Sequence, residues 1–499
     1  MFRKDNEMLT RSAYIKLSIA LVFTVMLVTA SVFAQTPPPP QGTLERQVED
    51  VKSENAAVRE QLKTMEEQQK ALQETVDRLQ RELGGVTPAG GATQPGPAGT
   101  QRPERYQDGI VIWQTPETEK VPFLMKYNQD IQLRYLNTLS SEDTYTDHLG
   151  VVRDVHKRND ITVNRTMLVL GGYIFSKRLV YNFKVWSSAG AASIVVAGNL
   201  GWSFSKALTL MTGYTGVPGS RSLVNTFPYF AATDRTMADN FMRPGFTQGT
   251  WAMGELPKHV NYLAFVGNGL NTLSISATKI DTNLVTSGSV WWEPLGDYGA
   301  VGKSRNMYDD YFSTNKVRIR IGTSFTHARE DRFSNLDTST PENTSMYNSD
   351  GVLLFSTGAF APGVTVQEAT YKMSAIDAGI KWKGLAVNGQ YYSRWVYDFD
   401  ADGPMPLTST FDNGFELSVG HFVVPKKLNV FGRGSMVFGQ FSDSWEYAGG
   451  FKWHFLPTER LWLSGEVMRV HKAPYSGAFT PYTAGMDGWV PMIQAVLAF

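Results

Sequence analysis

The stretch KVRIRI at residues 316–321 alternates cations with branched apolar side chains. Successive side chains of a β-strand point to opposite faces, so the apolar residues share one face and Lys316, Arg318 and Arg320 share the other. A soluble β-sandwich would turn the apolar face inward, whereas a barrel in lipid turns it outward around a polar lumen. This stretch alone is compatible with both folds.

Aromatic residues favour the barrel. Tyr447, Phe451 and Trp453 fall on one face of a predicted strand, and Lys452 and His454 fall on the other. Rows of exposed aromatic side chains are typical of the interfacial girdle of a membrane barrel and suit the core of a small sandwich less well.

The connections also favour a membrane barrel, in which tight turns at one end alternate with long loops at the other. Tight turns are expected at 176–178, 205–206, 257–258, 425–427 and 457–459. Long outer loops are expected at 140–160, 215–244, 297–314, 327–349, 398–409 and 472–488. At about 24 residues per strand and connection, the region predicts an all-β transmembrane barrel of roughly 16 antiparallel strands, wide enough for an aqueous channel.

The composition excludes several classes of protein. The chain has 499 residues, 47 basic and 47 acidic side chains, and no cysteine. The balanced charge argues against a nucleic-acid-binding protein, and the lack of cysteine excludes disulfides, thiolate metal sites and a cysteine nucleophile. A mean hydropathy of -0.23 excludes a polytopic helical membrane protein, which needs several apolar runs of about 20 residues.

Four regions differ in composition. Residues 1–34 begin with basic side chains and continue as an apolar run, which predicts a signal peptide; an uncleaved inner-membrane anchor is the alternative. Residues 35–84 are expected to form a coiled-coil oligomerisation rod, and residues 85–110 a Gly/Pro-rich linker. Residues 111–499 are expected to form the barrel. We therefore expect the barrel in a bacterial outer membrane and the rod in the periplasm.

The rod prediction rests on a heptad repeat from Leu44 to Leu83, in which core positions fall alternately four and three residues apart. Asn55 occupies a core position, which favours a dimer. A single solvated helix is the alternative, but the segment has no other face to bury, so self-association is expected.

Several stretches, taken in order, resemble the phosphate-selective porins O and P. They are NRTMLVLGGYIFSKRLVYNFKV at 164–185, GYTGVPGSRSLVNTFPYFAATDRTMADN at 213–240, RPGF at 243–246, VGNG at 266–269, DAGIK at 377–381 and YYSR at 391–394. The resemblance covers most of residues 120–499. It implies a trimeric, 16-stranded outer-membrane channel with anion preference, whose third long loop folds into the lumen; this favours a trimer over the dimer that Asn55 suggests.

The resemblance places Arg221, Arg235 and Arg243 in the inward loop, with Asp234 and Asp239 moderating their field. Alternation places further cations on the lumen face, namely Lys126, Arg134, Lys184, Arg433 and Lys452. Lys316, Arg318 and Arg320 either join this set or lie above the membrane, because in lipid each would cost about 2–4 kcal/mol. We expect these cations to line the pore and bind anions, for which guanidinium groups supply forked donors. The alternative is a solvated lumen wall that balances acidic loops.

Asp398, Asp400 and Asp402, followed by Gly403, match the opening half of a calcium-binding loop. Position 12 of such a loop would be Ser409, which lacks the bidentate carboxylate. Calcium bound by the three aspartates is therefore a minor hypothesis beside an acidic turn.

The sequence contains no motif that indicates an enzyme or a cofactor. Asp297 stands where a phosphate-binding loop ending at 302–304 would need its first glycine, and neither G-x-S-x-G nor H-E-x-x-H occurs. We expect no catalytic residues and no cofactor; a hydrolase site assembled from distant residues is the alternative.

The sequence therefore predicts an outer-membrane porin that passes small solutes by diffusion, with a preference for anions such as phosphate. A near-neutral barrel is also compatible with a general or weakly anion-selective pore. The expected partners are further copies of the chain, outer-membrane lipid, small anionic solutes and the cell wall, without nucleic acid. The alternative function is a structural anchor whose coiled coil tethers the outer membrane to the cell wall.

Overall fold

The computed structural model describes residues 106–499 apart from 117, 189–192, 225, 273–279, 300–306, 333–345 and 478. The predicted signal peptide (1–34), coiled coil (35–84) and most of the linker (85–110) lie outside the described residues. Within the described residues, no helix is both long and apolar enough to cross a membrane.

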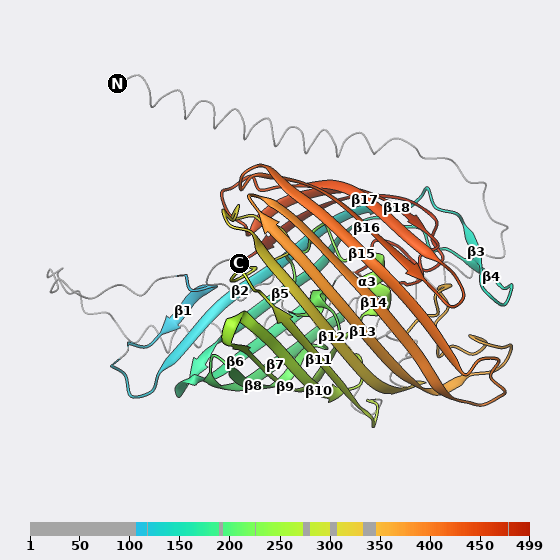
Figure 1. The fold of residues 1–499 in the computed structure, drawn as a ribbon, viewed down its shortest axis with the longest axis horizontal. Coiled ribbons are helices and arrows are strands. Elements are labelled where there is room, and N and C mark those ends of the chain that lie inside the picture. The colour runs from blue at the N-terminus through green and yellow to red at the C-terminus, as the bar shows by residue number, and fades with distance from the viewer. Residues whose placement is uncertain are drawn as a thin grey trace, which may run out of the picture. The chain divides into compact units, whose positions relative to one another are not determined.

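Strands dominate the described chain (Figure 1). They are β1 (Ile110–Gln114), β2 (Phe123–Asn137), β3 (Thr144–Thr146), β4 (Val152–Asp154), β5 (Asn159–Ile174), β6 (Ser176–Ser188), β7 (Ser193–Ser205), β8 (Leu208–Gly216), β9 (Phe246–Leu256), β10 (Val260–Asn268), β11 (Leu284–Trp292), β12 (Arg318–Asp331), β13 (Val366–Trp382), β14 (Leu385–Ala401), β15 (Ser409–Val424), β16 (Leu428–Phe438), β17 (Ser444–Trp453), β18 (Leu461–His471) and β19 (Gly488–Ala498). The helical elements are η1 (Arg221–Leu223), α3 (Met237–Met242) and η2 (Pro257–His259).

Sixteen antiparallel strands, β2 and β5 to β19, close into a barrel. Each pairs with the next along the chain, and β19 pairs back with β2, from Ala498 opposite Asp130 to Met492 opposite Leu136. We call this pairing the seam. The short strand β1 pairs with the N-terminal part of β2, next to the seam. The predicted fold class and strand number are confirmed.

The two faces of the barrel wall differ as the alternation predicts. Tyr447 on the outer face is 51% exposed, whereas Lys452 on the lumen face of the same strand is 2% exposed. On β12, Ile321 is exposed and Arg320 is buried. Since the apolar side chains point outward and the charged ones inward, the wall has the polarity of a barrel in lipid and the reverse of a soluble sandwich.

The two ends of the barrel have different connections. At the turn end, β5 passes to β6, β7 to β8, β13 to β14 and β15 to β16 through tight turns. At the loop end, longer segments such as 138–158, 217–245 and 332–365 connect the strands. The segment predicted as an outer loop at 297–314 is an exception, because it lies within the connection 293–317 at the turn end. That prediction was wrong because the length of a connection does not show at which end of the barrel it lies.

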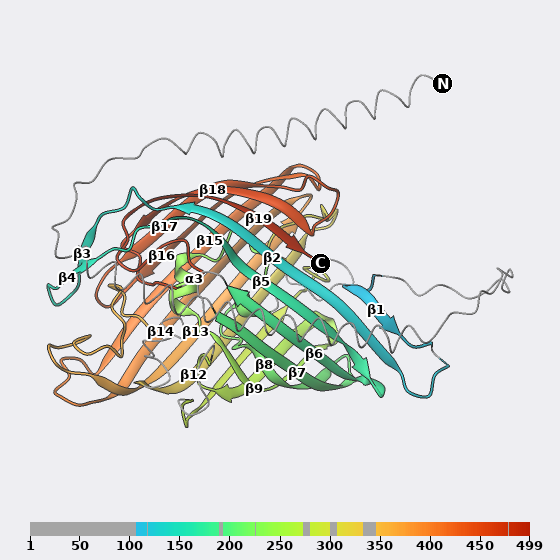
Figure 2. The ribbon, with the colours of Figure 1, turned by 180° about the vertical axis from the view of Figure 1, so that it is seen from behind.

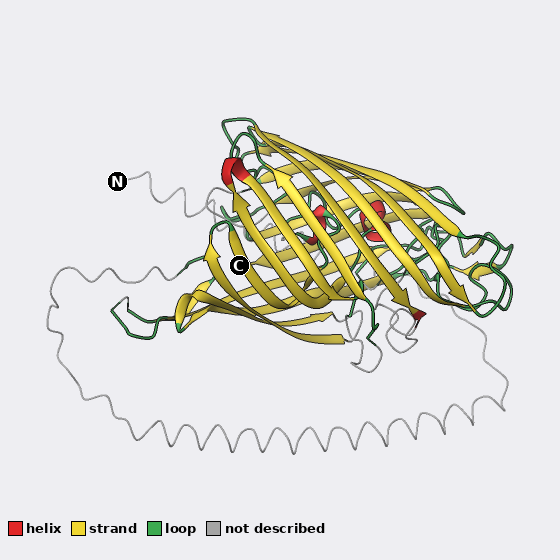
Figure 3. Cartoon of the chain, turned by 60° about the horizontal axis from the view of Figure 1, so that its bottom comes forward, coloured by secondary structure: helices red, strands yellow, loops and turns green. Residues whose placement is uncertain are grey.

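Segments from both ends fill part of the lumen. The segment 217–245, between β8 and β9, turns into the barrel, and its helix α3 packs against strands β14 to β17 (Figure 2). Figure 3 shows the same short helix inside the ring of strands. Most lumen-facing side chains of β12 to β18 are consequently buried.

Candidate functional site

The segment 217–245, here called the inward loop, is held in the lumen by its own turns and by wall residues. The Thr236 hydroxyl accepts a hydrogen bond from the backbone N–H of Asp239 (3.2 Å) and so caps α3. Two buried acids of the wall also bind its backbone: Glu446 accepts from the N–H of Met237 (2.8 Å) and Glu466 from that of Thr233 (3.1 Å). The predicted inward position of this loop is present in the structure.

Asp234 is the main ionic contact of the inward loop with the wall. Its carboxylate pairs with Arg134 on β2 and with Arg165 on β5, the latter at 3.0 Å. Burial alone would raise the pKa of Asp234, but Arg165, Arg134 and Arg235 together hold it well below its usual value. Asp234 therefore stays ionised and neutralises wall cations that were predicted to bind solutes.

The other two predicted loop arginines surround Asp239 loosely. The Nε atoms of Arg235 and Arg243 lie 3.6 and 3.9 Å from its carboxylate. Arg235 also donates to the Ser222 hydroxyl (3.1 Å) and stacks on Phe230, with its Cζ atom 4.5 Å from the ring centre. Arg235 is buried and Arg243 is partly exposed.

Arg221 has no carboxylate partner within ion-pair distance among the described residues. Its guanidinium lies 4.0 Å from the ring centre of Tyr308 and 5.2 Å from that of Tyr298, and Nη1 donates to Asn388 (2.8 Å). Its Nε and Nη2 atoms are buried and have no hydrogen-bond partner in the described part of the chain. A buried guanidinium with unused donors is a candidate anion-binding group.

The predicted ladder of Lys316, Arg318 and Arg320 does not act as a unit. Lys316 is exposed and precedes β12. Arg318 donates to the backbone carbonyl of Leu295. Arg320 pairs with Asp377 at 2.7 Å, and its Cζ atom lies 4.8 Å from the ring centre of Trp291.

Two further predicted cations are in buried ion pairs. Arg433 pairs with Glu466 at 2.6 Å and with Glu446 at 3.2 Å. Lys452 pairs with Asp309 at 3.2 Å. These groups face the lumen but have their charge compensated by protein.

Lys126 and Lys184 are more accessible. They face the lumen from β2 and β6, in a patch of partly exposed side chains that continues to β7 and includes Asn182 and Asn199. Asp130 is the acidic neighbour of Lys184. Lys126 donates to the backbone carbonyl of Gln107 (3.0 Å). We call this side of the lumen the accessible wall.

The acidic stretch 398–402 lies at the end of β14, where its aspartates contact other residues of the chain. Strand β14 extends to Ala401, and its pairing with β13 is irregular at Asp398, whose φ is positive (56°). Asp398 pairs with Arg329 at 2.8 Å, and Asp402 accepts from the N–H of Thr365 (2.7 Å). The carboxylates of Asp398 and Asp402 thus bind neighbouring segments of the same chain.

Another set of side chains, at the turn end, has the spacing of metal ligands. His259 Nδ1 lies 3.3 Å from Glu255 and 3.5 Å from Asp297. Lys206 already pairs with the second oxygen of Glu255 at 2.9 Å.

Several charged lumen residues were missed by the sequence analysis. Arg165 was quoted in the resemblance but not assigned to the lumen, because a bulge in β5 opposite Gln132 and Leu133 shifts the alternation there. Glu446 and Glu466 could have been found from the alternation of side chains along their strands. Each lies an even number of residues from a lumen-facing neighbour and therefore points to the same face. Arg394, which pairs with Asp412 at 2.7 Å, carried the same signal.

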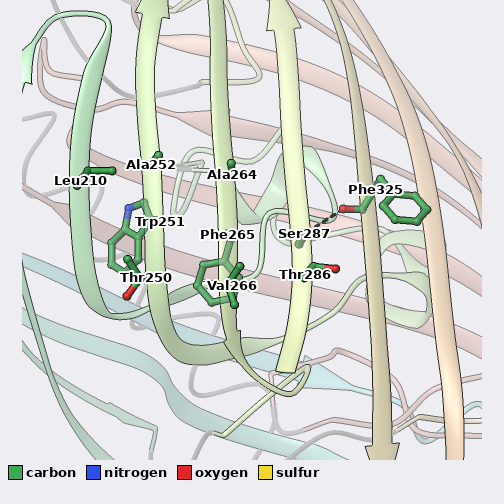
Figure 4. A pocket seen from close by; sticks show the side chains of 10 residues that line it. All are labelled: Leu210, Thr250, Trp251, Ala252, Ala264, Phe265, Val266, Thr286, Ser287 and Phe325. Carbon is green, nitrogen blue, oxygen red and sulfur yellow. Dashed lines mark hydrogen bonds between the residues drawn. The ribbon is translucent and has the colours of Figure 1, made fainter. Parts of the chain in front are cut away.

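A hollow of about 360 Å³ lies on the wall at β8 to β12 (Figure 4). Exposed Leu210, Val266 and Phe325 line it, together with Trp251 and Phe265. None of its lining residues carries a charge, so the polar chemistry of the molecule lies in the lumen.

The closed ring of strands, the apolar outer wall and the charged lumen define a transmembrane β-barrel. No family model matches the chain, and no curated protein matches it. Solved structures with a similar fold include OmpT, an outer-membrane protein of Vibrio cholerae (10% identity, 77% of this chain and 99% of that one, TM-score 0.47). Two others are the anion-selective porin of Comamonas acidovorans (10%, 75% and 99%, 0.46) and the outer-membrane channel DcaP of Acinetobacter baumannii (8%, 77% and 99%, 0.43).

Proposed function

We propose that this chain is an outer-membrane porin through which small solutes diffuse, with a preference for anions. The observation that carries the proposal is a closed barrel of 16 strands whose apolar face is outside and whose charged face lines the interior. Such a barrel is wide enough for an aqueous path.

The anion preference rests on the accessible wall. Lys126 and Lys184 are partly exposed there, whereas Arg320, Arg433 and Lys452 are buried in ion pairs. Charges that solvent reaches act on a passing ion, and charges already compensated by a buried partner act much less. Asp130 moderates the charge of Lys184, so the expected preference is modest.

A phosphate preference, as in the porins that the sequence resembles, would need a stronger site. Arg221 supports this finer proposal because two of its guanidinium nitrogens are buried without a partner among the described residues.

Three copies of the chain, assembled with the help of the rod at 35–84, complete the proposed channel.

Reversing the charge of Lys184 is expected to lower the anion preference. A unit charge about 8 Å from an ion in water contributes roughly 0.5 kcal/mol, so the change of two units in Lys184→Glu corresponds to about 1 kcal/mol, or roughly fivefold in the permeability ratio. The measurement is the reversal potential of single channels in a planar bilayer under a KCl gradient.

Lys426→Glu is the matched control, because Lys426 is exposed in the turn between β15 and β16 and makes the same charge change away from the lumen. An equal shift in both variants would contradict the assignment of Lys184 to the path. Block of chloride current by added phosphate, lost in Arg221→Met, would support the phosphate preference.

The alternative of a structural anchor depends on residues 35–84, which lie outside the described residues. Deleting residues 35–104 separates the two functions. Loss of envelope attachment with unchanged conductance would give the rod a tethering role beside the channel. Well-folded protein that forms no channels would remove the porin proposal and leave the anchor.

A further inference from the structure

The connection between β11 and β12 enters the lumen from the turn end. Its described parts, 293–299 and 307–317, are here called the turn-end strap. Tyr298, Met307 and Tyr311 of the strap are buried inside the barrel. Among the described residues, the tight turns that join neighbouring strands at this end form no such insertion.

The strap reaches as far round the barrel as strand β17. Asp309 pairs with Lys452 on β17 at 3.2 Å, and the ring of Tyr311 lies 4.9 Å from His454 and 5.6 Å from Phe422 at ring centres. In the strand order, β17 is six strands beyond β11 in a ring of sixteen. Between these strands the N–H of Lys383, in the turn after β13, donates to the carbonyl of Thr314 (2.8 Å), so the described parts of the strap lie along the inside of the wall at the turn end, from β12 to β17.

The strap also contacts the inward loop. The backbone N–H of Tyr308 donates to the carbonyl of Tyr229 (3.2 Å), and the ring of Tyr308 covers the guanidinium of Arg221. The segment from the loop end and the segment from the turn end thus meet inside the barrel.

Buried wall groups bind the strap on both of its arms. Lys381 on β13 donates to the carbonyls of Tyr298 (2.9 Å) and Met307 (2.8 Å). The carboxylate of Asp310 accepts from the N–H of Gly384 (2.7 Å) in the turn after β13. These contacts hold the strap against β13 and the turn that follows it, and among the described residues Asp309 supplies its ion pair with β17.

We propose that the turn-end strap is a second constriction, in series with the inward loop, and that the pair Asp309–Lys452 holds it against β17 inside the turn-end mouth. The inference rests on the proposed channel function. A solute that has passed the inward loop must still pass the strap, so the resistances of the two elements add. Lys452 also donates to the carbonyl of Phe230 in the inward loop, so Asp309→Asn, which leaves this bond in place, releases the strap from β17 without changing the first resistance.

The double variant Asp309→Cys/Lys452→Cys tests this inference, because the chain contains no other cysteine. It removes both charges together and so leaves neither unpaired. With both thiols reduced, we expect the single-channel conductance to rise roughly twofold, since the cross-section of the path limits the current. A bifunctional methanethiosulfonate with a short spacer should bridge the two thiols and return the conductance to the wild-type value, and dithiothreitol should raise it again.

The single variants, treated with the same reagent, are the controls, because they are modified but cannot be bridged. Conductance of the double variant equal to wild type in both the reduced and bridged states would overturn the inference. If the double variant does not fold, the milder Asp309→Asn tests the same point, with unchanged conductance again contradicting it. Wild-type protein without channels would instead contradict the proposed function, so the two failures are distinguishable.

Discussion

Replacing Asp234 by asparagine is expected to destabilise the barrel by about 3–5 kcal/mol, the range for breaking a buried ion pair from one side. The amide keeps the shape and an acceptor oxygen but removes the charge that compensates Arg134 and Arg165. Both guanidiniums are buried, so water cannot take over that role. The free energy of unfolding in urea, followed by tryptophan fluorescence in detergent micelles, measures the loss.

The same substitution is expected to loosen the inward loop and to increase the conductance and its fluctuations. Asp443→Asn is the matched control, because Asp443 is exposed at the loop end and such surface changes usually stay within about 0.5 kcal/mol. Equal stability of the two variants would mean that Asp234 does not compensate the wall arginines.

Asp234 also gives the loop a defined response to acid. A carboxylate with a depressed pKa in the folded protein contributes its full stabilisation above the pKa of the unfolded chain, which is about 3.9. That contribution declines as the pH falls through the lower pKa of the folded state. We therefore expect this contact to remain intact from pH 7 to about pH 4.5 and to weaken only below about pH 4.

Arg433→Met is expected to be comparably damaging, by about 3–5 kcal/mol, although Arg433 was predicted as a pore-lining residue. It leaves Glu446 and Glu466 buried next to each other without their shared cation. Both carboxylates also accept backbone N–H groups of the inward loop, so their repulsion acts on the loop as well as on the wall.

The triple variant Arg433→Met/Glu446→Gln/Glu466→Gln is expected to recover much of this loss, because all three charges disappear and the glutamine oxygens still accept the backbone donors. Urea unfolding of the single and triple variants makes the comparison. If the single variant is as stable as wild type, Arg433 is a solvated residue of the pore wall, as the sequence predicted, and not part of a buried ion pair. Failure of the triple variant to recover would mean that the side-chain shape of Arg433 matters more than its charge.

The barrel could be predicted from the sequence because a strand records its two faces in alternate residues. Lys452 lies between aromatic neighbours, and this alternation predicts that it faces the lumen independently of the rest of the chain. The strand number followed from the spacing of the alternating stretches. These are local properties, and local patterns survive in the linear sequence.

The pairing of the lumen charges could not be predicted, because it depends on residues far apart. Asp234 lies 100 positions from Arg134, and Asp309 lies 143 positions from Lys452. Alternation shows that a cation faces the lumen but not whether an acid from an inserted segment reaches it. The direction of the connection 293–317 was hidden for the same reason, since its length is similar to that of an outer loop.

The seam between β2 and β19 has a consequence for the order of assembly. Its members are about as distant in sequence as the barrel allows: Arg134 bonds Gln494, 360 positions away. Every other pair in the ring joins neighbours along the chain, so those pairs can form progressively, while the seam pays the largest loop-closure entropy. The ring therefore closes last, and substitutions of outward-facing seam residues such as Leu133 should delay insertion without altering the current through molecules that have finished folding.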